Sequence, residues 1–182
     1  MNEQYFDIAR TELQEGAKDA GHPFHFFTLA TTGINQVPRL RTVVLRKVSK
    51  DLTLTIFTDK RSRKVTHIKE HNKVCVLFYH PEKLLQLKID GVAYMESDQK
   101  KLQKIWDSMD APKKKDYLTA KEPGTKISHL EQIEYLDTSQ HFSVMHIEPY
   151  KIEYLKLKRP NHIRVQYSLT DGNKWESSFL VP

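Results

Sequence analysis

Residues 41–64 read RTVVLRKVSKDLTLTIFTDKRSRK and predict two strands followed by the start of a helix. Leu52, Leu54 and Ile56 alternate with the residues between them, which is the period-two pattern of a strand with one buried face. Residues 42–48 are β-branched and basic by turns and predict the preceding strand. Ser62 stands at a good N-cap position for a helix expected over residues 63–71.

The first turn of that helix is unusually basic. Arg63 and Lys64 lie where the helix macrodipole is already positive, which costs about a few tenths of a kcal/mol if nothing compensates. An anion would compensate, because free helix N–H groups, a Ser hydroxyl and two cationic side chains together suit a phosphate. We expect both cationic side chains to face solvent when the site is empty. Taken alone, the tripeptide is better explained as a solvated basic turn.

The wider stretch carries an ordered set of short motifs: Arg41-Thr42-Val43-Val44-Leu45, Phe57-Thr58, Ser62-Arg63-Lys64 and Gln86-Leu87-Lys88-Ile89-Asp90-Gly91. In order and separation they resemble the FMN-binding split-barrel family typified by pyridoxamine 5'-phosphate oxidase. The family pattern runs R-x-V-x-L, an aromatic residue plus Thr, S-R-K and Q-x-R-x-x-G. The resemblance is good from about residue 38 to residue 95, and its specificity comes from the ordered set.

The resemblance implies an antiparallel split β-barrel with peripheral helices, a mainly β (α+β) fold, that binds FMN. The phosphate would be held by Arg41, Arg63 and Lys64 with two hydroxyls, and backbone from residue 42 to 45 would run beside the isoalloxazine. Family members are two-fold dimers with FMN at the interface, so we expect a homodimer in which Gln86 serves the partner's site. The implied cofactor-binding residues are Arg41, Thr42, Val43, Val44, Phe57, Thr58, Ser62, Arg63, Lys64, Gln86 and Arg164.

The resemblance weakens where the oxidase binds its substrate. Near the C-terminus, Arg164 matches an FMN-contacting arginine, but Leu155 stands where the oxidase has Trp. Pro160 replaces an arginine that holds the substrate phosphate, and Met109 takes the position of another. The resemblance therefore implies a retained cofactor site and a different, unknown small-molecule substrate. It assigns no catalytic residue and no metal ligand.

Composition and length set the broad class. With 182 residues, 38% hydrophobic and 29% charged, the chain is expected to form one globular domain over residues 1–182. No apolar run approaches the ~20 residues needed to span a membrane. The N-terminal stretch is mixed in charge and does not resemble a signal peptide. A single cysteine, Cys75, excludes an internal disulfide framework and favours a cytoplasmic location; its apolar strand predicts a core position.

The net charge of +6 is unevenly distributed. Residues 39–73 contain eleven Lys or Arg against three Asp or Glu, so the basic surplus coincides with the expected phosphate site. Such a field suits a small polyanion. Three functions are compared: an FMN-dependent oxidoreductase, a flavin-binding protein that stores or senses FMN without turnover, and a nucleic-acid-binding module. The last is disfavoured because no RNP-like motif is present.

The remaining chain predicts many short strands and few helices. Pro149 is expected to break a strand, Gly91 to mark a bulge or close backbone approach, and residues 113–115 to form a loop. His67 and His71 are spaced i, i+4, but without a third ligand they are expected to be structural or solvent-facing. An amphipathic helix is expected over residues 2–19, with Tyr5, Ile8, Ala9 and Leu13 on one side. A second helix is expected after Asp98, with Leu102, Ile105, Trp106 and Met109 facing inward, and a capping box at Ser128 and Glu131. The other expected strands are 24–32, 74–79, 84–95, 142–147, 150–157, 163–169 and 174–181.

Overall fold

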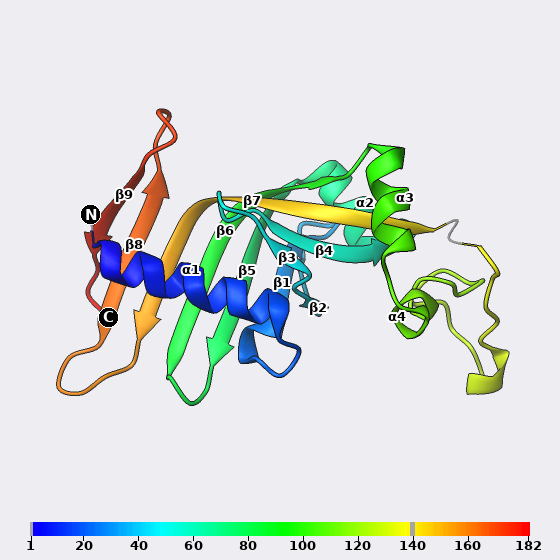
Figure 1. Cartoon of the computed structure of the whole chain (residues 1–182), viewed down its shortest axis with the longest axis horizontal. Coiled ribbons are helices and arrows are strands. Elements are labelled where there is room, and N and C mark those ends of the chain that lie inside the picture. The colour runs from blue at the N-terminus through cyan, green and yellow to red at the C-terminus, as the bar shows by residue number, and fades with distance from the viewer. Residues whose placement is uncertain (1, 139–140) are drawn as a thin grey trace.

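The computed structural model describes residues 2–138 and 141–182, in which nine strands form one antiparallel sheet curled into a split barrel (Figure 1). The strand order is β2-β1-β5-β6-β7-β4-β3, and β8 and β9 continue from β7. This agrees with the mainly β fold predicted from the sequence. The strands are β1 (Phe26–Thr32), β2 (Pro38–Val44), β3 (Lys47–Val48), β4 (Leu54–Asp59), β5 (Lys73–His80), β6 (Leu85–Met95), β7 (Phe142–Lys156), β8 (Ile163–Leu169) and β9 (Trp175–Phe179).

The long strand β7 divides the sheet. Its residues 142–147 pair with β4, whereas residues 151–156 pair with β8. The predicted break at Pro149 is wrong, because the strand runs through this residue beside a register shift between Asp90 and Gly91. Gly91 is needed there, since a Cβ on it would lie 2.8 Å from the Glu148 carbonyl oxygen. The prediction of a bulge with close backbone approach is confirmed.

The main core lies between the sheet and helix α1 (Glu3–Lys18), which crosses one face of the sheet in Figure 1. Phe6, Ala9 and Leu13 are buried at helical spacing. Ile8 was predicted to share this face but is 40% exposed, because the buried stripe passes through Phe6 instead. The 3-10 turn η1 (Pro23–His25) then leads the chain into β1.

A second, smaller core lies at the end of the molecule opposite the termini (Figure 1). Helix α3 (Gln99–Asp107) contributes the predicted apolar stripe, which packs on Phe142 and Val144. The loop expected at residues 113–115 is instead part of a short helix, α4 (Ala111–Lys115), because Pro112 suits a first helical turn. The predicted capping box is also wrong: a single turn, η2 (Leu130–Gln132), follows His129 and has no side-chain cap.

The outer face of the barrel is partly apolar. Along β5 the residues Val74, Val76 and Phe78 are buried, so the alternate residues point outward. Cys75 is one of these, and its predicted core position is wrong, since it is only half-buried beside Asp90. In the described part of the chain, no helix is both long and apolar enough to cross a membrane.

Candidate functional site

The turn from β4 into helix α2 (Arg63–Glu70) gathers two hydroxyls around one ammonium group. The Lys64 Nζ donates to Thr58 Oγ1 at 2.9 Å and to Ser62 Oγ at 3.2 Å. Thr58 and Ser62 are themselves 3.2 Å apart, and both are buried. Ser62 is the N-cap residue, as predicted, but its hydroxyl makes no cap bond to the helix. It faces the site instead and leaves the first amides of α2 without a side-chain acceptor.

Lys64 does not face solvent as expected, because its side chain lies partly buried over these hydroxyls. Burial lowers the pKa of Lys64, and nearby Arg41 lowers it further, against a smaller opposing effect from Asp59. Arg63, by contrast, is exposed as predicted. A partly desolvated cation beside a second cation is costly unless an anion joins them.

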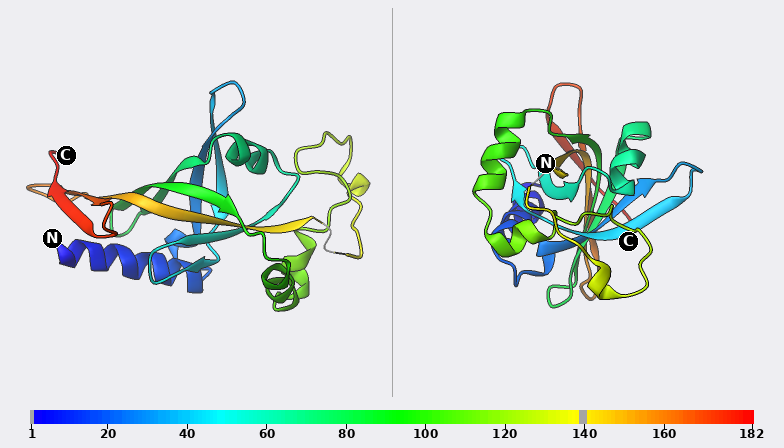
Figure 2. Two further views of the ribbon diagram at one scale, coloured as in Figure 1. Left: turned by 90° about the horizontal axis from the view of Figure 1, so that it is seen from above. Right: turned by 90° about the vertical axis from the view of Figure 1, so that its right-hand side faces the viewer.

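Arg41 reaches the same region from β2. One of its guanidinium nitrogens, Nη1, donates to Thr31 Oγ1 at 2.7 Å and to the Leu29 carbonyl at 3.2 Å. Partial burial lowers the pKa of Arg41. A cleft of about 480 Å³ opens beside it. The β1–β2 hairpin, which carries part of the cleft lining, protrudes from the barrel in Figure 2. The lining of the cleft includes Arg39, Arg41, Arg63, Thr66 and His67, together with the apolar Ile34 and Leu40.

The charge balance of this region fits a phosphate. Throughout residues 2–138 and 141–182, no carboxylate forms an ion pair with Arg41, Arg63 or Lys64. Hydroxyl and carbonyl oxygens accept their hydrogen bonds without neutralising their charge. The donors, the charge and the uncapped helix N-terminus are therefore those that a phosphomonoester requires.

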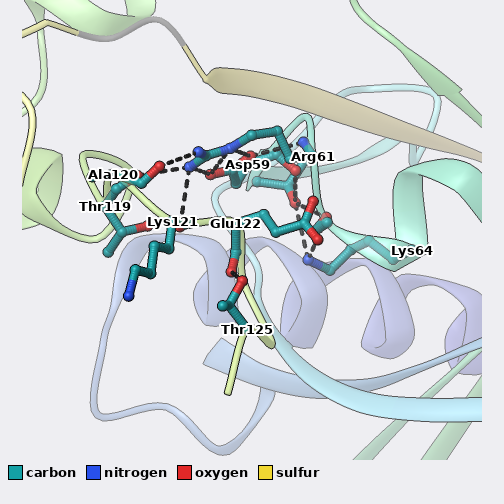
Figure 3. Close-up of polar contacts among 10 residues, drawn as sticks. Asp59, Arg61, Lys64, Thr119, Ala120, Lys121, Glu122 and Thr125 are labelled. Carbon is teal, nitrogen blue, oxygen red and sulfur yellow. Dashed lines mark hydrogen bonds and ion pairs between the residues drawn. The ribbon is translucent and has the colours of Figure 1, made fainter. Parts of the chain in front are cut away.

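The same turn also holds a distant loop. Asp59 and Arg61 form a bidentate pair with a closest distance of 2.6 Å, and the Asp59 side chain is only 4% exposed. Arg61 also donates to the carbonyls of Thr119 and Ala120 at 2.7 and 2.8 Å (Figure 3). The hydrogen bond and charge of Asp59, with a contribution from Glu122, raise the pKa of Arg61. The β4–α2 turn thus contributes Thr58 and Ser62 to the contacts of Lys64. It also contributes the Asp59–Arg61 pair that holds this loop.

The residues expected beside the isoalloxazine lie on the neighbouring strands. Thr42 is exposed, whereas Val43 and Val44 are partly buried along β2. Phe57 stands next to Thr58 on β4, but its ring packs on Phe142, with centroids 5.4 Å apart. The Arg46 guanidinium lies over the Phe57 ring, 5.5 Å from its centroid. Phe57 therefore belongs to the smaller core as well as to the edge of the site.

Gln86 and Arg164 lie in one row across β6, β7 and β8, because both pair with Leu155. Directly paired residues point to the same face of a sheet. Arg41 pairs with Leu29, which pairs with Val76, and Val76 pairs with Ile89. Since Ile89 and Gln86 are three residues apart on one strand, Arg41 and Gln86 leave the sheet on opposite faces. One chain therefore does not bring these two predicted residues together.

Several functional contacts were not predicted. Arg164 is paired with the buried Glu153 at 3.0 Å, and Lys88 lies 3.7 Å from the same carboxylate. Within the strand predicted over residues 84–95, Gln86 and Lys88 are two positions apart and so share one face, which was the available signal for these contacts. Thr31 and His67, which support Arg41, gave no signal because they are 36 residues apart. Met109 packs in the smaller core, and its side chain has no donor that could bind an anion.

A second cluster gathers ionisable groups away from this site. Glu12, His22 and His80 place one possible ligand atom each within 4.8 Å of the others. The Nδ1 atoms of both histidines accept backbone N–H groups, from Phe24 at 3.1 Å and Lys83 at 3.3 Å. Each neutral ring must then carry its proton on Nε2, the atom that a metal would need. With Nε2 protonated on both rings, neither histidine offers a lone pair to a metal ion, so the cluster does not favour metal binding.

Comparison with known proteins places this geometry in a family. The model of the pyridoxamine 5'-phosphate oxidase FMN-binding domain matches residues 7–97. A pyridoxine/pyridoxamine 5'-phosphate oxidase from Thermosynechococcus vestitus is 28% identical over an alignment of 167 residues, and the match covers 85% of this chain and 78% of that protein. The segment that the domain model matches, residues 7–97, contains β1 to β6, and with them Arg41 and the whole β4–α2 turn.

Two solved structures share the fold. A pyridoxamine 5'-phosphate oxidase-related FMN-binding protein from Nostoc punctiforme has a TM-score of 0.80 at 20% identity, covering 96% of each chain. PhzG from Burkholderia lata, in complex with tetrahydrophenazine-1-carboxylic acid, has a TM-score of 0.76 at 18% identity, covering 99% of this chain and 90% of PhzG. Both confirm the split barrel. Together with the domain match, they show that this chain belongs, as a divergent member, to the pyridoxamine 5'-phosphate oxidase FMN-binding family.

Proposed function

We propose that the cofactor phosphate of FMN is bound by Arg41, Thr58, Ser62, Arg63 and Lys64. The observation that carries this proposal is the cluster of cations at the N-terminus of α2, which has no carboxylate partner among residues 2–138 and 141–182. An FMN phosphate would accept hydrogen bonds from the ammonium, the guanidinium groups and the helix amides. The isoalloxazine would lie along residues 42–44 and near Phe57.

We also propose that two copies of the chain complete each site. Gln86 and Arg164 share the outer face of the sheet, whereas Arg41 points to the other face, so they serve one flavin only if a partner supplies them. The outer face is suitable for burial against a second copy, since Leu77 and Tyr79 are 38% and 47% exposed there. Each chain forms a single domain over residues 1–182, supported by its one continuous sheet.

The reaction that fits this site is a flavin-dependent oxidation or reduction of a small molecule. Bound FMN supplies the redox chemistry, and the protein supplies orientation and electrostatics. The substrate differs from pyridoxamine 5'-phosphate, because Met109 and Pro160 occupy the positions where the oxidase has substrate-binding arginines. Neither residue can donate to a phosphate. Those same replacements are the reason to keep the alternative of a flavin-binding protein without turnover.

Titration of the apoprotein with FMN, followed by flavin fluorescence, tests the site. Wild-type protein should bind one FMN per chain, and Arg63→Ala with Lys64→Ala should lower the affinity by about two orders of magnitude or more. Lys69→Ala is the matched control, since Lys69 is an exposed lysine in the last turn of the same helix. Unchanged binding in the double variant would place the phosphate elsewhere.

Turnover distinguishes the two functions. Holoprotein mixed anaerobically with NADH or NADPH should lose its oxidised flavin absorbance if the protein is an oxidoreductase that uses a nicotinamide reductant. Re-oxidation by oxygen or by added acceptors would then be followed. Flavin that stays oxidised with both nucleotides, and with a panel of amine and dihydroaromatic compounds, would favour the protein that binds FMN without turnover.

A further inference from the structure

A chain of hydrogen bonds leads from the proposed phosphate site into the interior. Arg41 Nη1 donates to Thr31 Oγ1 at 2.7 Å, and Thr31 Oγ1 lies 3.0 Å from His67 Nδ1. Thr31 and His67 are 3% and 7% exposed, respectively, so both are shielded from water. The chain joins β2 to α2 through β1, and residues of β2 and α2 line the cleft.

Chemistry fixes the direction of one of these hydrogen bonds. A guanidinium can only donate, so Thr31 Oγ1 accepts from Arg41. The hydroxyl keeps its one proton and a second lone pair, so it can either donate to His67 Nδ1 or accept from it. Donation to Nδ1 is favoured, because accepting from a guanidinium polarises the hydroxyl towards donation. In that arrangement the neutral imidazole carries its proton on Nε2.

The surroundings of His67 favour the same neutral form. Burial lowers the pKa of His67 most, and the positive charges of Arg41, Arg39 and Arg63 lower it further. Glu70, on the same helix, acts in the opposite direction with a smaller effect. His67 is therefore an uncharged acceptor among cations, and its ring also lines the cleft.

We propose that Thr31 and His67 are positioning residues that fix Arg41 for phosphate binding. They tie the guanidinium on β2 to helix α2, which carries Arg63 and Lys64, and so set the two halves of the phosphate site relative to each other. The inference rests on the proposed FMN site and deepens it. Its consequence is selective: the two residues contribute to affinity for the phosphate and not to affinity for the isoalloxazine.

Comparison of FMN with riboflavin, which lacks the phosphate, separates this role from a general structural one. Thr31→Val keeps the shape and β-branching but removes the hydroxyl. It should weaken FMN binding about ten- to a hundredfold and leave riboflavin binding within about twofold. Thr31→Ser should restore FMN affinity. Thr32→Val is the matched control, because the neighbouring Thr32 side chain makes no hydrogen bond within the described part of the chain.

A second measurement needs no variant. The ring ¹⁵N signals of His67 in the wild-type protein at neutral pH should show an unprotonated Nδ1 and a protonated Nε2. The proton on Nδ1, or equal losses of FMN and riboflavin affinity in Thr31→Val, would overturn the proposal. Unchanged FMN affinity in Thr31→Val would overturn it as well, while the FMN site itself stood. Wild-type protein that binds no FMN would instead overturn the proposed function, and the positioning role with it.

Discussion

Lys64 shows how function and stability oppose each other at a single residue. Its ammonium is partly desolvated and lies near Arg41, and among the described residues it is hydrogen-bonded only to neutral hydroxyls. Nothing in the fold needs a cation there, since two apolar clusters hold the chain together elsewhere. The charge is therefore best explained as being kept for an anionic ligand.

Lys64→Met should separate these two roles. Removing the ammonium relieves its desolvation and its repulsion with Arg41, so the free energy of unfolding of the apoprotein should rise by about 0.5–1 kcal/mol. FMN affinity should fall at the same time. Urea denaturation of the apoproteins measures the first effect. A loss of apoprotein stability greater than about 1 kcal/mol would mean that Lys64 has a structural role.

The β4–α2 turn joins two parts of the molecule that the sequence separates. Through Arg61 it holds backbone carbonyls of residues 119–121, and Thr58, Ser62 and Lys64 form part of the proposed phosphate site. The loop is closed on itself by a bond from the Ala120 N–H to the Glu134 carbonyl at 2.9 Å. Arg61 is thus one side chain that attaches this exposed segment to the barrel.

Arg61→Ala should release the loop. The substitution removes the hydrogen bonds to residues 119–121 and leaves Asp59 buried without its partner. Trypsin should then cleave after Lys121 or Lys126 several-fold faster than in the wild type. Lys60→Ala, at the exposed neighbouring residue, serves as the control. Equal cleavage rates in the wild type and Arg61→Ala would show that the loop is held by other contacts.

Local patterns predicted most elements but not how they meet. The alternation over residues 52–57 predicted the strand β4, but its expected single buried face was wrong, because Thr53 and Thr55 are buried as well as Leu54 and Ile56. The apolar spacing predicted α3, whose stripe is partly buried in the smaller core. The break at Pro149 was wrong because Gly91, 58 residues away, makes room on the paired strand. The phosphate-site residues were predicted through the family resemblance. The contacts of Arg41 with Thr31, and of Arg61 with Thr119, depend on strand pairing and loop packing that no local pattern carries.

Acidification should destabilise the whole apoprotein through two histidines. The pKa values of His67 and His80 are lowered from 6.5, chiefly by burial. The unfolded chain therefore takes up protons at a higher pH than the folded chain, so stability is lost as the pH falls from about 6.5 through the lowered values. The charges facing them are Arg39, Arg41, Arg63 and Glu70 for His67, and Lys83, Glu12, His22 and Glu82 for His80.

The unfolding free energy of the apoprotein, measured in urea from about pH 7.5 to pH 5, checks this expectation. The variant with His67→Asn and His80→Asn keeps an acceptor near each Nδ1 position but cannot titrate, so its stability should vary less with pH. An equally steep pH dependence in this variant would assign the effect to other groups. The Glu12–His22 contact, 3.2 Å from Nε2 to the carboxylate, would be examined next.

We propose that two copies of this chain hold FMN between them. Sedimentation velocity of the holoprotein, detected at the flavin absorbance, tests the cofactor and the assembly in one experiment. Flavin absorbance should sediment with a particle of about twice the 21.4 kDa chain mass. Flavin that sediments with a single chain, or stays at the meniscus while the protein sediments without it, would contradict the account.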